Sequence, residues 1–201
     1  MPLFKKHKLG APNVDKIERS KSYYDQKYEK EYHIENYYPI FDKVIEYISP
    51  ESKESPILDI GCGIGECARR LKEEGFQSYL GFDLSESAIR EAKKRVPEWK
   101  NHFKIQNVYE MDALSFPYKI AIAIEVLEHI QDLKLLKMLK PGTILIGSIP
   151  NYWSSNNEHL RVYPNKFHIW WRFRPFMKIH KWHKHSFNKY RFIHTFVATI
   201  K

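Results

Sequence analysis

The chain has 201 residues, which is enough for one α/β domain with a substantial core. No apolar run approaches the roughly 20 residues that cross a bilayer, and no apolar segment typical of a secretory signal is evident near residue 1. Two cysteines, Cys62 and Cys67, are too few for a disulfide framework, so we expect a reducing, cytoplasmic compartment.

The net charge of +9 is concentrated near the C-terminal end. Residues 151–201 carry ten Lys or Arg side chains, and Glu158 is their single acid, whereas basic and acidic side chains balance over residues 1–150. Such a field raises the local concentration of anions. Residues 151–185 are also rich in Trp and make up a basic aromatic segment. Its partner is a phosphorylated or nucleotide-linked metabolite, nucleic acid or an anionic membrane surface; a merely solvated face is the alternative.

The first fifty residues divide into an expected mobile tail and an expected helical segment that covers the domain. Residues 1–20 are polar and predict a mobile tail. Residues 21–50 show apolar and aromatic residues at helical spacing, among them Tyr24 and Tyr28. We expect residues 21–201 to form a single domain in which these helices precede the first strand.

A glycine-rich motif follows at residues 57–65, ILDIGCGIG. An apolar run that reaches an acid, Asp59, and then Gly61, Gly63 and Gly65 predicts a buried strand, a tight turn and a helix start. The pattern differs from the dinucleotide motif G-x-G-x-x-G and lacks the Lys-Ser/Thr of a P-loop. It resembles motif I of the class I S-adenosylmethionine (SAM)-dependent methyltransferases. The resemblance implies that Asp59 and the three glycines contact SAM.

Acids after the next strands agree with that family. Residues 80–83 predict a second strand ending in Asp83, which the resemblance implies binds both ribose hydroxyls of SAM. A third strand near 103–108 leads to Asp112, at the family's adenine contact. The implied SAM-binding set also includes Leu84, Ala113, Glu125, Tyr24 and Tyr28.

Strands and helices alternate after Gly65, which favours a parallel sheet. The family resemblance implies an α/β, Rossmann-like, seven-stranded and mostly parallel sheet with helices on both faces and a C-terminal β-hairpin. The hairpin strands are expected at residues 178–187 and 190–200. Open α/β sheets bind ligands at the carboxyl ends of their strands, so the SAM cleft is expected there.

Residues 125–129, EVLEH, follow the fourth strand and contain the candidate catalytic residues His129 and Glu125. The string is similar to that of methyltransferases acting on small molecules and glycan precursors, in which the His acts as a base, orients the substrate or caps a helix. It is also similar to that of RNA 3′-terminal 2′-O-methyltransferases, which bind a metal through these residues and a distant His. His159 or His168 is the candidate for that further ligand. We predict that no metal is required.

A second clue lies after the fifth strand. Residues 148–151 (SIPN) and 157–163 (NEHLRVY) resemble a methyltransferase group often concerned with glycans and secondary metabolites. The resemblance implies that the basic aromatic segment, residues 151–185, lies on the substrate side. Asn151, His159 and Arg161 are therefore predicted substrate contacts, and the Arg161 guanidinium suits a carboxylate or phosphate. Anchoring of the loop is the alternative.

The predicted function is SAM-dependent O-methylation of a small anionic acceptor, such as a phosphorylated or nucleotide-linked metabolite or a glycan precursor. One alternative is an RNA 2′-O-methyltransferase with a Glu/Glu/His metal site, although no RNA-binding module is recognisable. Another is a catalytically silent SAM-fold partner subunit, which the intact glycines and acids disfavour. The oligomeric state stays open.

Overall fold

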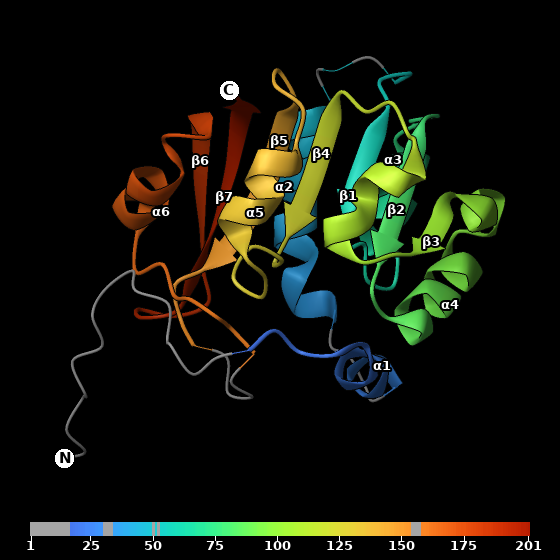
Figure 1. Ribbon diagram of the computed structural model, residues 1–201, viewed down its shortest axis with the longest axis horizontal. Coiled ribbons are helices and arrows are strands. Elements are labelled where there is room, and N and C mark those ends of the chain that lie inside the picture. The colour runs from blue at the N-terminus through green and yellow to red at the C-terminus, as the bar shows by residue number, and fades with distance from the viewer. Residues whose placement is uncertain (1–16, 30–33, 50, 52, 154–157) are drawn as a thin grey trace.

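The computed structural model describes residues 17–29, 34–49, 51, 53–153 and 158–201. A seven-stranded sheet in the order β3-β2-β1-β4-β5-β7-β6 runs through the molecule, with helices on both faces (Figure 1). The strands are β1 Ile57–Ile60, β2 Tyr79–Asp83, β3 Phe103–Ile105, β4 Ile120–Ile124, β5 Ile144–Pro150, β6 Met177–Ser186 and β7 Phe192–Ile200. The helices are α1 Lys21–Glu29, η1 Ile34–Tyr37, α2 Tyr38–Ile48, α3 Glu66–Glu73, α4 Glu86–Arg95, η2 Pro97–His102, η3 Val108–Leu114, α5 Asp132–Met138 and α6 Lys166–Phe173.

Strand directions confirm the predicted α/β fold. Strands β1 to β5 pair in parallel, whereas β7 pairs antiparallel with both β5 and β6 and closes the sheet with a hairpin. The hairpin strands lie within two residues of the predicted bounds. Among the described residues, no helix has both the length and the apolar character needed to cross a membrane.

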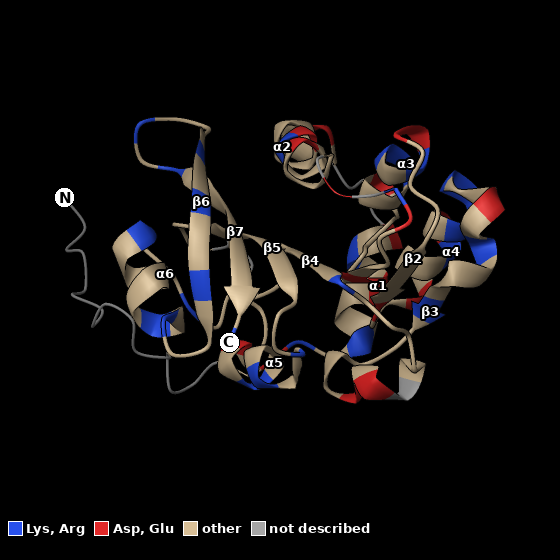
Figure 2. Cartoon of the chain, turned by 90° about the horizontal axis from the view of Figure 1, so that it is seen from above, with Lys and Arg blue, Asp and Glu red and all other residues tan. Residues whose placement is uncertain are grey.

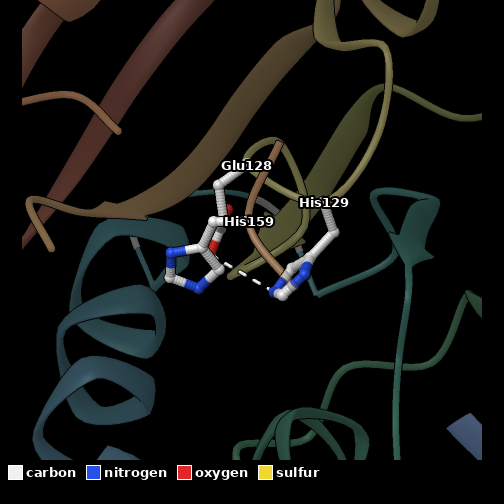
Figure 3. Close-up of side chains that lie close together, drawn as sticks. All are labelled: Glu128, His129 and His159. Carbon is white, nitrogen blue, oxygen red and sulfur yellow. Dashed lines mark ion pairs between the residues drawn. The ribbon is translucent and has the colours of Figure 1, made fainter. Parts of the chain in front are cut away.

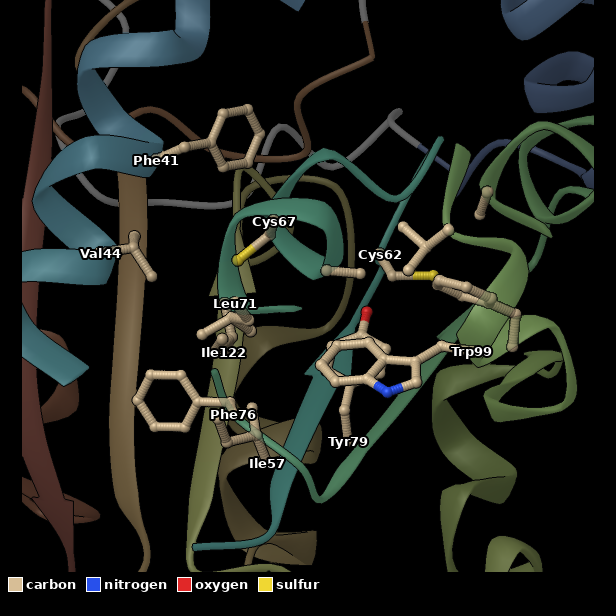
Figure 4. Packing of buried hydrophobic residues seen from close by; sticks show 14 of the residues in the cluster. Phe41, Val44, Ile57, Cys62, Cys67, Leu71, Phe76, Tyr79, Trp99 and Ile122 are labelled. Atoms are coloured by element: carbon tan, nitrogen blue, oxygen red, sulfur yellow. The ribbon is translucent and has the colours of Figure 1, made fainter. Parts of the chain in front are cut away.

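Two cores cover the two faces of the sheet, because successive strand residues point to opposite sides. Ile57, Ile120 and Ile122 pack into the core beneath α2, α3 and α4, whereas Leu58 and Ala121 pack into the core beneath η3, α5 and α6. Figure 4 shows the first core, in which Tyr79 and Trp99 stack with ring centroids 4.8 Å apart. The central strands are therefore buried on both sides and their carboxyl ends are held rigidly.

Helix α1 lies across the carboxyl ends of the parallel strands (Figure 1). Asp25 anchors it, since its carboxylate accepts hydrogen bonds from Ser85 Oγ (2.7 Å) and the Ser87 amide (3.2 Å). Residues 1–16 of the predicted mobile tail lie outside the described residues. The end of that tail packs on the domain, because Glu18 accepts hydrogen bonds from the Gln131 amide (2.9 Å) and the Tyr109 hydroxyl.

Candidate functional site

A cavity of about 670 Å³ lies between α1 and the carboxyl ends of β1, β2 and β4. Sites in open α/β sheets form at this edge because the loops after neighbouring parallel strands meet there. The predicted site residues on its wall are Tyr24, Tyr28, Asp59, Gly61, Gly63, Asp83, Leu84, Glu125, His129 and His159. Gly65, Asp112, Asn151 and Arg161 are not part of the wall.

The glycine-rich turn after β1 needs glycine for two reasons. Gly61 and Gly63 have φ of +69° and +52°, in the left-handed region that side chains disfavour. A Cβ on Gly61 would lie 2.7 Å from Val126 Cγ2, and one on Gly63 would lie 3.1 Å from the Tyr28 hydroxyl. Gly65, the third glycine, instead packs against Ala92 of α4 and fixes the start of α3. The turn thus presents bare backbone to the cavity.

Two buried acids flank this turn. Asp83, at the end of β2, accepts hydrogen bonds from the Gly63 amide (3.0 Å) and the Ser85 amide (2.9 Å). Burial raises its pKa, although these two bonds oppose the shift. Burial also raises the pKa of Asp59 to about 7, against the hydrogen bond that the Tyr79 hydroxyl donates at 2.8 Å. The Asp83 carboxylate is therefore fixed against the turn, where a ligand hydroxyl can reach it.

The end of the cavity next to β3 differs from the prediction. Asp112 is exposed and lies off the cavity wall, because η3 turns it toward solvent; the side chain of Ala113 lies outside the described part of the chain. The wall is formed instead by the three residues directly after β3, which are Gln106, Asn107 and Val108. Asp112, which the family resemblance implies at the adenine contact, lies further along the chain in η3.

Helix α1 forms the cover of the cavity through Tyr24, Lys27 and Tyr28. Lys27 Nζ lies 2.7 Å from Glu158 Oε2, and the Tyr23 hydroxyl donates to Glu158 Oε1 at 2.7 Å. Burial opposes ionisation of Glu158, but these two hydrogen bonds outweigh it and lower its pKa to about 2. A charged contact therefore connects the cover to the segment after β5.

Glu125 begins the EVLEH string immediately after β4. Its φ of +55° is unusual for a residue with a side chain, and it ends the strand in a turn, so the next helix begins only at Asp132. Ser148 holds it, with Oγ donating to Glu125 Oε1 at 2.7 Å and accepting from the Glu125 amide at 3.0 Å. Burial raises the pKa of Glu125 to about 7, which the Ser148 bond and Lys27 oppose.

Glu128, His129 and His159 converge beside the cavity (Figure 3), where the two histidines are part of the wall and Glu128 is buried next to them. Each offers one ligand atom, and these atoms lie within 4.8 Å of one another, so the three side chains could hold a metal ion. Glu128 is fully buried and its two carboxylate oxygens make no hydrogen bond within the described chain; burial raises its pKa well above the usual range. Its Oε1 lies 3.7 Å from His129 Nε2.

Both imidazoles of this cluster are oriented by backbone carbonyls. His129 Nδ1 lies 3.3 Å from the Glu158 carbonyl, and His159 Nδ1 lies 2.8 Å from the Tyr152 carbonyl. Burial, followed by the charges of His159 and Lys27, lowers the pKa of His129 to about 3. His129 is therefore neutral near pH 7.

The other two predicted substrate contacts, Arg161 and Asn151, lie off the cavity wall. Arg161 turns away from the cavity because its guanidinium donates to the Ile130 carbonyl (3.0 Å) and pairs with buried Asp132 (3.3 Å). Asn151 bonds to the Tyr190 carbonyl (2.9 Å) and the Phe192 amide (2.8 Å) and so fixes the β5–β7 junction. Both side chains anchor loops, which was the alternative interpretation.

The sequence reasoning missed three cavity residues on the same side, Tyr152, Trp153 and Arg191. Arg191 lies over the Tyr152 ring, with Cζ 5.4 Å from its centroid. The antiparallel pairing of β5 with β7, which ends at Pro150 and Ile193, brings residue 191 close to residue 152, so the predicted hairpin contained the signal for it. Figure 2 shows that most of the Lys and Arg residues of α6 and β6 lie at the far end of the molecule from α1.

Comparisons with known proteins agree with this geometry. Residues 32–191 match a family model described as a methyltransferase domain. A ubiquinone biosynthesis O-methyltransferase of Bradyrhizobium diazoefficiens is 33% identical over 134 residues, which cover 58% of this chain and 51% of that protein. An mRNA cap guanine-N(7) methyltransferase of Schizosaccharomyces pombe is 28% identical over 129 residues, which cover 54% of this chain and 36% of that protein.

The fold is also shared with solved structures. The magnesium protoporphyrin IX methyltransferase of Synechocystis with bound S-adenosylhomocysteine (SAH) superimposes with a TM-score of 0.68 at 15% identity, covering 90% of this chain and 97% of that one. Likeness at this identity concerns the fold alone. The chain matches about half or less of the length of the two curated relatives.

Proposed function

Since the chain belongs to the family of SAM-dependent methyltransferases, we propose that it methylates a hydroxyl oxygen of a small anionic acceptor. The single observation that carries this is the composition of the cavity wall. One end is a bare glycine turn with a fixed acid, and the other holds His129, His159 and the cation Arg191. The buried free thiols agree with a cytoplasmic enzyme, as we infer from the cysteine content.

The cofactor end supports the following assignments. We assign the ribose contact to Asp83, whose carboxylate already faces the turn through the Gly63 amide. The backbone of Gly61 and Gly63 lines the cavity where the methionine part of SAM would lie, and Asn107 takes the adenine contact expected of Asp112. Tyr24 and Tyr28 would close over the cofactor from α1.

The acceptor end supports an anion with a planar or ring-shaped part. Arg191 offers a guanidinium for a phosphate or carboxylate, and Tyr152 and Trp153 offer aromatic faces beside it. We assign Arg191 the anion-binding role that the sequence predicts for Arg161, because Arg161 is paired with Asp132. The charge excess of residues 151–201 therefore acts on the acceptor mainly through one side chain.

SAM supplies an activated methyl group, so the protein chiefly has to orient the acceptor and remove its proton. Glu125 has a pKa of about 7, near the pH at which a general base works best. We assign it the proton of the acceptor hydroxyl, which Glu125 would take up when bound SAM supplies the methyl group to that oxygen. His129, neutral and fixed by the Glu158 carbonyl, would orient that hydroxyl.

The acceptor assignment is tested by screening phosphorylated, nucleotide-linked and neutral hydroxyl compounds beside short RNAs for methyl transfer. With the best acceptor, Arg191→Gln should lower kcat/KM about tenfold, because one charge-assisted hydrogen bond is lost. Arg174→Gln, a control that removes an exposed cation off the cavity wall, should have no effect. A preference for neutral acceptors, or equal losses in both variants, would overturn the anionic assignment.

A second candidate is metal-assisted methylation of an RNA 2′-hydroxyl. The observation that favours it is the convergence of Glu128, His129 and His159, together with the two carboxylate oxygens of Glu128 that lack hydrogen bonds. A carboxylate and two imidazoles are a donor set suited to Mn²⁺ or a related divalent cation. Calorimetric titration of the purified protein with Mn²⁺, repeated on His159→Gln, separates the two proposals. Binding that His159→Gln abolishes, with activity lost to a chelator, would replace our metal-free proposal.

A further inference from the structure

Helix α6 carries apolar side chains on two opposite faces. Ile169 and Phe173 are fully buried and pack into the core beneath the sheet. On the other side, Phe167, Trp170 and Trp171 keep 58%, 41% and 55% of their surface exposed. Spacings of three and four residues place these rings on one face of the helix. The fold uses the first face, and nothing within the described chain buries the second.

The exposed rings form one continuous patch. The Phe167 centroid lies 5.8 Å from that of Trp170 and 6.1 Å from that of Trp171, and the two indoles are 6.3 Å apart. Arg174 covers one edge, with Cζ 3.9 Å from the Trp171 centroid. Contiguous exposed aromatic patches on a folded domain indicate an interaction surface.

The helix is fixed so that this patch must point outward. The Asn165 side chain caps its first turn by accepting from the Phe167 amide at 3.0 Å. The Arg172 guanidinium donates to both carboxylate oxygens of buried Asp132, at 2.6 and 2.8 Å. Rotation of α6 to bury the indoles would break this ion pair and expose Ile169 and Phe173. The exposure of the patch is therefore a consequence of its anchoring.

The side chains near the patch are basic, which favours a partner with negative charge. Lys166 begins α6, Arg174 directly follows it and Lys178 lies near the start of β6; all three are exposed, and no acidic residue occurs in the sequence after Glu158. Figure 2 shows Lys and Arg on α6 and β6 and no Asp or Glu on either. A symmetric contact with a second copy would bring like charges together. The three rings also lie outside the cavity described above, and they come from a single helix, whereas proteins that bind single strands align aromatic side chains along a charged groove.

We propose that Phe167, Trp170 and Trp171, with Lys166, Arg174 and Lys178, form a docking surface for membranes that contain anionic lipids; we call it the α6 surface. Indole rings prefer the interface between headgroups and acyl chains, and the surrounding cations are attracted to anionic headgroups. This peripheral contact involves no membrane-spanning helix, and it does not depend on the identity of the acceptor.

The test is co-sedimentation of the purified chain with vesicles of equal parts phosphatidylcholine and phosphatidylglycerol, and with vesicles of phosphatidylcholine alone. The wild type should sediment with the anionic vesicles, with a blue shift of its tryptophan emission, and salt should weaken the binding. The double variant Phe167→Ala/Trp171→Ala should bind about tenfold more weakly or worse, because two inserted rings are lost. Ile105→Ala removes a 45% exposed apolar side chain from β3, at the opposite edge of the sheet, and should bind like the wild type.

A second variant protects the test against misfolding. Lys166→Gln/Lys178→Gln changes only exposed polar side chains and should weaken binding about fivefold for each charge, with the affinity for SAH unchanged. Equal binding to both kinds of vesicle, no binding at low salt, or equal losses in Ile105→Ala would overturn the proposal. So would a dimer in light scattering that Trp171→Ala dissociates, or RNA binding at these residues without vesicle binding.

Discussion

The turn after β1 and the segment after β5 both leave the sheet at its carboxyl edge, yet they use their residues differently. In the turn, Gly61 and Gly63 present backbone to the cavity, and the neighbouring acid is fixed by backbone amides. In the segment, Arg161 and Asn151 point into loop contacts, while His159 reaches the cavity. Backbone conformation therefore determines the function of the first region, and side-chain direction determines that of the second.

The largest expected effect tests the first region. Asp83→Ala should weaken the binding of SAH at least about a hundredfold, because two charge-assisted hydrogen bonds to the ribose are together worth about 3 kcal/mol or more. Isothermal titration calorimetry measures this. Asp112→Ala serves as the control, since Asp112 is exposed and off the cavity wall; its affinity should equal that of the wild type. If Asp112→Ala weakens SAH binding and Asp83→Ala does not, Asp112 would be the adenine contact expected from the sequence and the ribose assignment of Asp83 would be wrong.

The second prediction tests the anchoring role of Arg161. Arg161→Met removes one of the cations paired with buried Asp132 and the bond to the Ile130 carbonyl, so the free energy of unfolding should fall by about 2 kcal/mol. The melting temperature should fall by about 4 to 8 °C in a chain of this size. Arg191→Met, at an exposed cavity position, should change stability by less than about 0.5 kcal/mol. If Arg161→Met keeps full stability but loses acceptor affinity, the comparison between the two regions is wrong.

A smaller effect concerns His129, where the two regions meet. Its pKa is about 3 in the folded chain, against about 6.5 when unfolded. Below about pH 6.5 the unfolded chain therefore takes up a proton that the folded chain does not, and the free energy of unfolding falls with falling pH. Glu125, with a pKa raised to about 7, has the opposite effect between pH 7 and its unfolded value.

The measurement must therefore compare His129→Gln with the wild type by urea denaturation at about pH 7 and at about pH 5. The variant lacks the histidine penalty and should gain about 2 kcal/mol relative to the wild type between about pH 7 and pH 5. Parallel pH dependences of the two proteins would mean that His129 is protonated in the folded state, and its role as a neutral orienting group would be lost.

Most of the fold and the glycine turn could be predicted from sequence because both depend on local rules. The apolar run 57–60 is buried on two sides, the three glycines adopt positive φ, and Ser85 caps α4 as expected by accepting from the Ala88 amide at 3.2 Å. Each of these features follows from a few consecutive residues.

The rest depends on contacts between distant segments. The sequence predicts Arg161 as an anion ligand, but in the structure Arg161 pairs with Asp132 in α5. No spacing in the sequence indicates that pairing. The position of Arg191 near the end of β5 could have been predicted, because an antiparallel β7 must begin beside the end of β5. Lys27 and Glu158 meet only because α1 crosses the sheet edge, and their 131-residue separation hides the contact.

The two cysteines have a practical consequence. Cys62 and Cys67 are the only cysteines in the sequence, both thiols are free and buried, and burial raises the pKa of each well above its ordinary value. Alkylating reagents, which react with thiolates, should therefore modify these two cysteines only slowly in the native protein. A single cysteine introduced on α1 or α6 becomes a selective attachment point for a fluorophore or spin label. The position of the cavity cover and the proposed contact of α6 with a bilayer can then be tested without first mutating the glycine turn.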